Sequence, residues 1–117
     1  MLPPLSDDAA APEAKAVFDD IRAVRGTETI NNFWRGLAHD PALLARTWEA
    51  VKATMAPGAL DPLTKELIYV AVSVAHGCEY CINSNTAAAR AKGMTDEMLM
   101  ELVAVVGMAS ETNRHVT

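Results

Sequence analysis

The stretch ELIYVAVSVAHGCEYCINSNTAAA, residues 66–89, decides the fold of this chain. Its first half is almost wholly apolar. A glycine follows, and the two cysteines of the chain, Cys78 and Cys81, stand three residues apart directly after it. This order predicts a buried helix, a stop at Gly77 and a second helix that starts at or just after Cys78. What the chain does depends on the use it makes of these two cysteines.

Outward from this stretch the sequence predicts helices only, because β-branched residues never alternate cleanly with polar ones. Asp40-Pro41 and Asp61-Pro62 each place a capping Asp before a Pro that suits the first helical position. We expect an all-α fold, a compact six-helix bundle in a single domain over residues 1–117. The expected helices cover about Pro12 to Arg25, Ile30 to Ala38, Pro41 to Ala56, Pro62 to His76, Cys78 to Lys92, and the Thr95 cap to about Asn113.

The helix predicted after Asp61 is apolar around almost its whole circumference, which indicates burial. One narrow polar line interrupts it, formed by Glu66, Tyr69, Ser73 and His76 at spacings that share one side of a helix. The line leads toward the cysteines and suggests supporting groups for them. The alternative is that Glu66 and His76 lie at exposed helix ends while Tyr69 and Ser73 are satisfied locally. The next helix is rich in Ala, which suits close packing inside a bundle or at a subunit contact.

Composition narrows the classes of partner. The 117 residues carry a net charge of −5, and Lys and Arg are scattered singly, so the basic patch of a nucleic-acid binder is missing. The N-terminus lacks the basic and apolar regions of a secretory signal, and no apolar run approaches the roughly 18 residues of a membrane span. We therefore expect a cytoplasmic protein whose partners are small molecules or other proteins, with no nucleic acid and no membrane.

Three interpretations of the cysteine pair are open. At a helix start, backbone amides and the helix dipole lower the pKa of a thiol, and a spacing of three residues allows a disulfide across one turn. Cys78 and Cys81 would then form a redox pair. A second interpretation is half of a zinc site with His76 as third ligand, although the spacing does not suit a zinc finger. A third is that both cysteines are inert core residues.

The same residues resemble the alkylhydroperoxidase D (AhpD)-like proteins of the carboxymuconolactone decarboxylase superfamily. The family pattern is a Glu, eleven residues, Cys-x-x-Cys, three residues and a His. Glu66 stands twelve residues before Cys78, as this pattern requires. Residues 92–97 and 105–114 are also similar to segments of the family. The resemblance implies the bundle fold, catalytic roles for Cys78, Cys81 and Glu66, and assembly into homo-oligomers, as trimers or hexamers.

The chain departs from the family pattern at one position. Where the family has its relay His, four residues after the second cysteine, this chain has Asn85, which cannot take up and pass on a proton. The relay implied by the resemblance would therefore lack its central member. His76 is a candidate substitute, and Tyr80 and Ser73 are candidate supporting groups. For Glu66 the alternative is an ordinary acid near a helix N-terminus.

The sequence thus predicts an enzyme, a thiol-disulfide oxidoreductase able to reduce alkyl hydroperoxides, an antioxidant peroxidase activity. Its partners would be a peroxide or disulfide substrate and a thiol electron-donor protein, with no cofactor and no metal. Two alternatives stand beside it. One is a non-redox enzyme of the same superfamily that acts on a small lactone or acid. The other is a catalytically degenerate oligomeric binding protein.

Overall fold

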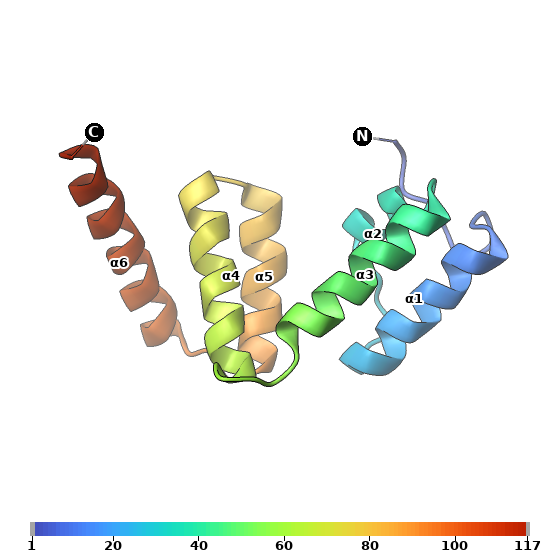
Figure 1. The fold of residues 1–117 in the computed structure, drawn as a ribbon, viewed down its shortest axis with the longest axis horizontal. Helices are drawn as coiled ribbons and strands as arrows, with labels where there is room; N and C mark the ends of the chain where they lie inside the picture. The colour runs from blue at the N-terminus through green and yellow to red at the C-terminus, as the bar shows by residue number, and fades with distance from the viewer. Residues whose placement is uncertain (1, 117) are drawn as a thin grey trace. The chain divides into compact units, whose positions relative to one another are not determined.

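The computed structural model describes residues 2–116. Capping residues and glycines near the helix ends account for most of its helix boundaries. Its six helices are α1 (Pro12–Arg25), α2 (Asn32–Leu37), α3 (Pro41–Met55), α4 (Pro62–His76), α5 (Glu79–Ala91) and α6 (Asp96–Arg114) (Figure 1). No strand occurs in these residues, so the all-α, six-helix prediction is confirmed. The helix predicted over Ile30 to Ala38 is shorter than expected, although both of those residues are buried.

Most of the predicted caps are present. The Asp61 side chain accepts a hydrogen bond from the Thr64 N–H at 2.9 Å, and Asp40 accepts one from the Leu43 N–H at 3.1 Å. Thr95 caps α6 in the same way through the N–H of Met98. These bonds satisfy amides that the first turn of a helix leaves without a partner, and they explain where α3, α4 and α6 start.

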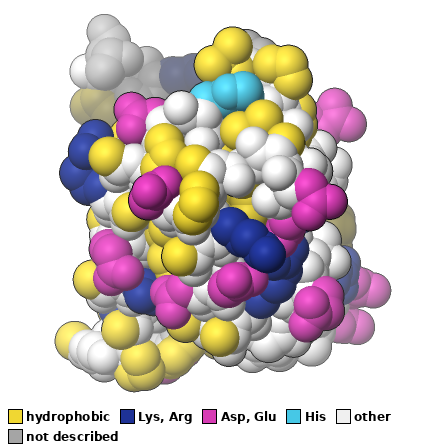
Figure 2. Space-filling model, turned by 90° about the vertical axis from the view of Figure 1, so that its right-hand side faces the viewer, with side chains coloured by type: hydrophobic (Ala, Val, Ile, Leu, Met, Phe, Trp, Pro, Cys, Tyr) yellow, Lys and Arg dark blue, Asp and Glu magenta, His cyan; other side chains and the backbone are white. Residues whose placement is uncertain are grey.

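The contacts of the described residues divide the chain into two compact units, with the boundary between Thr54 and Met55. Each unit has its own core, so the single-domain organisation stays a prediction. No helix in residues 2–116 is long and apolar enough to cross a bilayer. On the face drawn in Figure 2, Lys and Arg side chains lie among Asp and Glu side chains.

The first unit packs α1, α2 and α3 around two tryptophans. Trp34 and Trp48 meet edge to face with ring centroids 5.5 Å apart, and Trp48 Nε1 donates a hydrogen bond of 2.7 Å to Asp20. The buried core of this unit consists of Ala14, Phe18, Ile21, Ile30, Trp34, Ala38, Leu44 and Trp48. The indole N–H is thus satisfied at the core edge, which lets a large ring be buried without a polar penalty.

In the second unit α4 and α5 run side by side, and α6 packs against α4 (Figure 1). Val70, Ala89 and Met94 form the buried centre. The expectation that α4 is buried all round is wrong, since Ile68 and Val72 are 48% and 50% exposed. The reason is that α4 turns the face of Glu66, Val70 and Ser73 inward, and the opposite face has no cover from the described residues.

The N-terminal segment is held against the helices of the first unit by ion pairs of Asp7 with Arg22 and Arg35. Arg22 donates two hydrogen bonds to its carboxylate, at 2.8 and 2.9 Å, and Arg35 lies 3.0 Å from the same group. The hydrogen bonds from Arg22, followed by those from Arg35, lower the pKa of Asp7 from 3.8 to about 2. A depressed folded-state pKa means that this contact stabilises the fold above pH 3.8 and is lost as the pH falls toward about 2.

Replacing Asp7 by Asn should therefore lower the free energy of unfolding by about 1 kcal/mol at neutral pH, after allowance for solvent screening. The difference from wild type should vanish as the pH approaches about 2. Urea unfolding followed by tryptophan fluorescence measures it, because both tryptophans lie in this unit. Asp19→Asn is the matched control, since Asp19 pairs with the same Arg22 but its side chain is 63% exposed. An equal loss in the two variants would contradict the assignment.

The turn before Cys78 gives a second prediction. Gly77 has φ 67°, so an Ala there should cost about 1 kcal/mol of unfolding free energy from backbone strain. No atom lies within 4 Å of where its Cβ would stand, so the cost is not steric. Gly107, inside α6 and equally open, is the control, where Ala should stabilise by about 0.5–1 kcal/mol. Urea unfolding followed by circular dichroism should therefore show shifts of opposite sign, and shifts of the same sign would refute the explanation.

Candidate functional site

The turn at Gly77 and Cys78 positions the first cysteine of the pair at the start of α5. α4 ends at His76, and Gly77 takes a left-handed conformation in which its N–H returns to the carbonyls of Ser73 and Val74. The N–H of Cys78 also points back, to the Ser73 carbonyl at 3.4 Å. Cys78 itself is extended, with φ −87° and ψ 99°, and is the N-cap of α5. The chain therefore leaves one helix and enters the next with a cysteine at the entry position.

The sulfur of Cys78 acts as the capping atom. It accepts a hydrogen bond from the N–H of Cys81 at 3.3 Å, the role that an oxygen of Ser, Asp or Asn plays at other helix starts. The same sulfur is joined to that of Cys81 in a disulfide, with the two Cα atoms 5.2 Å apart. The prediction that this pair comes together at the start of the fifth helix is confirmed.

The two competing interpretations of the pair gain no support. Both cysteines are only partly buried, and neither belongs to the buried core of either unit. Among residues 2–116 no three His, Cys, Asp or Glu side chains are grouped as a metal-binding set. His76, the ligand suggested for zinc, is an exposed residue at the end of α4.

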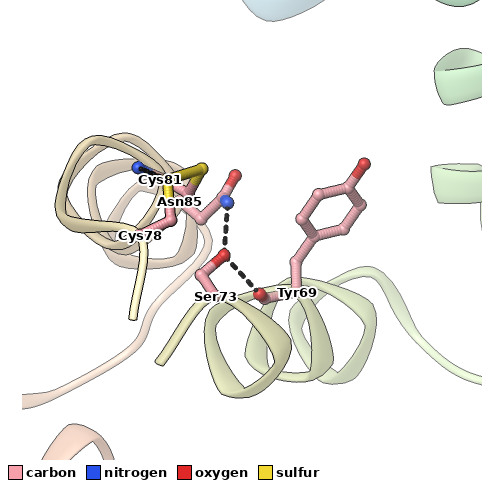
Figure 3. The surroundings of a disulfide bond; sticks show 5 residues. All are labelled: Tyr69, Ser73, Cys78, Cys81 and Asn85. Atoms are coloured by element: carbon pink, nitrogen blue, oxygen red, sulfur yellow. Dashed lines mark hydrogen bonds between the residues drawn. A yellow bond between two sulfur atoms is a disulfide. The ribbon is translucent and has the colours of Figure 1, made fainter. Parts of the chain in front are cut away.

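Asn85 connects α5 to α4. Its side-chain N–H donates to Ser73 Oγ at 2.9 Å, and the Ser73 hydroxyl donates to the carbonyl of Tyr69 at 2.9 Å (Figure 3). Asn85 follows Cys81 by four residues, so the two side chains share one face of α5. The structure therefore brings together Cys78, Cys81, Asn85 and Ser73, and the last two form a pair that was not foreseen.

The other predicted site residues lie further out. Glu66 is buried on the inward face of α4, but it stands two turns before Ser73, about 10 Å along the helix axis. Tyr69 and Tyr80 are 41% and 48% exposed. The polar line on α4 is thus split, because Glu66 and Ser73 face inward while Tyr69 and His76 face outward.

The sequence predicts that the fourth and fifth helices form an antiparallel hairpin, in which side chains of the two helices meet. This pattern could have indicated a contact between Ser73 and Asn85. The register of the hairpin could not be read in advance, because the angle between the helices decides which positions face each other. The small side chains of α5 allow α4 to approach closely here, and Ala89 is fully buried at the contact.

Comparison with known proteins identifies relatives of this chain. Residues 41–116 match the model of the carboxymuconolactone decarboxylase family. The crystal structure of the alkylhydroperoxidase AhpD core from Rhodospirillum rubrum is 63% identical, with a TM-score of 0.86, over 90% of this chain and 78% of that one. The predicted resemblance is thereby confirmed.

Two curated relatives are more distant. The uncharacterized protein 4 in the cox locus of Paracoccus denitrificans is 41% identical over 68 residues, which are 58% of this chain and 58% of that protein. An uncharacterized protein of Cupriavidus necator is 35% identical over 65 residues, 56% of this chain and 58% of that protein. The matched part thus spans little more than half the length of these relatives.

Proposed function

Because the chain belongs to the carboxymuconolactone decarboxylase family, and carries a cysteine pair that its fold brings into a disulfide, we propose that it is a thiol-disulfide oxidoreductase that reduces alkyl hydroperoxides. The observation that carries the proposal is the disulfide at the first turn of α5, with Cys78 as the capping residue. The two Cα atoms are 5.2 Å apart, within the ordinary range for a disulfide, so the pair can form the bond where the helix start places it. We place the reaction in the cytoplasm, where a thiol donor is present.

The reaction balances with two thiols and one peroxide. One thiolate attacks an oxygen of the hydroperoxide, so an S–O bond forms, the O–O bond breaks, and the alkoxide leaves as an alcohol with one proton. The second thiol attacks that sulfur, so the S–S bond forms, the S–O bond breaks, and water leaves with the second proton. The two sulfurs lose two electrons and the peroxide gains them. A dithiol or thiol donor protein then restores the pair by disulfide exchange.

The surrounding residues have supporting roles in this proposal. Glu66, buried on the inward face of α4, would serve as a general base at a distance through water. Exposed Tyr80, between the two cysteines, would donate a hydrogen bond to the departing oxygen. His76, at the exposed end of α4, would stand in for the relay histidine of the family pattern.

The proposal is tested with the reduced protein, cumene hydroperoxide and dithiothreitol as donor. Cys78→Ser and Cys81→Ser should each lower the rate of peroxide loss about a hundredfold or more, because neither alone can close the disulfide. Asn83→Ala, at an exposed position of α5 between the site residues, should leave the rate unchanged. Wild-type protein with no turnover of peroxide, or of a small disulfide, would contradict the proposal.

The name of the matched family favours one alternative, a non-redox activity on a small lactone or acid. That activity does not need a cysteine pair, so it should survive the double replacement of Cys78 and Cys81 by Ser. A chain that turns over neither class of compound and yet forms a stable oligomer would instead be a binding protein.

We further propose that copies of this chain assemble into a trimer or hexamer. α4 exposes Ile68 and Val72, and α6 exposes Met100, Val105 and Met108 by 60–66%. α4 and α6 pack against each other, and exposed apolar side chains on both helices suit an interaction surface. Identical copies pair such surfaces through symmetry.

Val72→Asp should therefore shift the mass measured by light scattering after size-exclusion chromatography toward that of the monomer, 12.5 kDa. The buried carboxylate would lack a partner, which outweighs the contacts that remain. Val24→Asp is the matched control, because Val24 is 58% exposed on α1 and should leave the mass unchanged. A wild-type chain that elutes as a monomer at every concentration would refute the assembly.

A further inference from the structure

We propose that Met98 is a second peroxide-reactive site of this chain, at which a hydroperoxide converts the thioether to a sulfoxide. The change opens the cap of α6 and loosens that helix from α4. The site lies outside the cysteine pair, and it rests on the proposed function only for the class of oxidant that the chain meets.

The cap of α6 uses a sulfur where an oxygen is usual. Thr95 Oγ1 accepts the N–H of Met98 at 3.1 Å, and Met98 Sδ accepts the N–H of Thr95 at 3.5 Å. This is a reciprocal capping box, in which the third helical residue is normally Glu or Gln. A thioether is a weak acceptor, so this half of the cap is the one that a chemical change at the sulfur disturbs most.

Met98 also joins the cap to the core of the second unit. Its side chain is partly exposed and packs against the buried cluster of Val70, Ala89 and Met94. Val70 belongs to α4, and α6 packs against α4. The same side chain therefore holds the first turn of α6 through its sulfur and connects α6 to α4 through its apolar contacts.

The other methionines of residues 94–108 differ from Met98. Met94 is only 4% exposed, so an oxidant reaches it when the unit opens. Met100 and Met108 are 66% and 60% exposed, and neither belongs to the cap or to the buried cluster. The Thr95–Met98 bond lies at an exposed helix start, so Met98 combines access from solvent with a role in both the cap and the core.

The oxidation balances with one thioether and one hydroperoxide. Met98 Sδ attacks the outer oxygen of the hydroperoxide, so an S–O bond forms and the O–O bond breaks. The proton on that oxygen passes to the departing alkoxide, which leaves as an alcohol. The sulfur loses two electrons and the peroxide gains them. Methionine sulfoxide reductases reverse the product, so the modification can act as a switch.

A sulfoxide does not fit the capped arrangement. An oxygen between Met98 Sδ and the Thr95 N–H has no room within 3.5 Å, because an N–H···O hydrogen bond alone spans about 2.9 Å. An oxygen elsewhere on the sulfur adds a polar group to a side chain that packs against the buried cluster, which is unfavourable. In both cases the side chain has to withdraw, and the first turn of α6 loses a cap and a core contact.

Peroxide treatment of the wild-type protein in its disulfide form tests the site. Both cysteines are joined in this form, so no thiol consumes the oxidant. After treatment with tert-butyl hydroperoxide, fragmentation mass spectrometry locates the added oxygen, and urea unfolding is followed by circular dichroism. We expect Met98 to be oxidised before Met94, and the urea midpoint to fall by about 0.5 M in parallel with oxidation of Met98. Oxidation of Met98 no sooner than that of Met94 would overturn the inference.

Met98→Leu separates the effect of this sulfur from general damage. Leu is similar in volume and cannot be oxidised, so treatment should leave the midpoint of this variant unchanged. Met98→Gln supplies the usual third residue of a capping box and should be equally insensitive. Met100→Leu is the matched control on the exposed face of α6, and treatment should lower its midpoint as much as that of wild type. An equal fall in treated Met98→Leu would refute the role of Met98.

These outcomes are independent of turnover by the cysteine pair. A loss of stability that follows Met98 oxidation, in a protein whose reduced form consumes no peroxide, would support the site and end the peroxidase proposal. Turnover by the reduced pair, with no change of the midpoint on oxidation of Met98, would do the opposite.

Discussion

The reversal at Gly77 and Cys78 is the constraint on which the site depends. A left-handed glycine ends α4 by returning its N–H to that helix, and the N–H of Cys78 follows it to the Ser73 carbonyl. Cys78 is thereby held in an extended conformation at the entry to α5, where only a side chain can cap the next amides. A sulfur takes that place. The same turn thus closes the hairpin of the second unit and sets the electrostatic surroundings of its cysteine pair.

The arrangement of α4 inverts the usual distribution of side chains. Glu66 and Ser73 are buried, while Ile68 and Val72 are exposed. Turning a carboxylate inward and two aliphatic side chains outward is unfavourable for an isolated chain. It is consistent with a helix whose inward face serves a polar site and whose outward face is covered by other copies. The site and the assembly would then be two consequences of one helix orientation.

Helix boundaries were predictable because single residues set them. Asp-Pro pairs open α3 and α4, and glycines at 26 and 77 end α1 and α4, so each boundary has a local cause. The orientation of α4 was not predictable, since a nearly all-apolar helix carries no signal that says which face is inward. The pairing of Ser73 with Asn85 was missed for a related reason, because register depends on how two helices cross and not on either sequence alone.

Asparagine at position 85 changes how the cysteine pair can be activated. A histidine relay draws its strength from a group that titrates near neutral pH, so its reactivity follows the protonation of the imidazole. Asn85 has no proton to exchange, and its amide is fixed by a hydrogen bond to Ser73. In the proposed reaction, activation would then rest on Glu66 acting through water and on the backbone amides at the start of α5, whose field does not vary with pH. The relay of the family pattern would thus be replaced, in the proposed function, by groups that lie outside position 85.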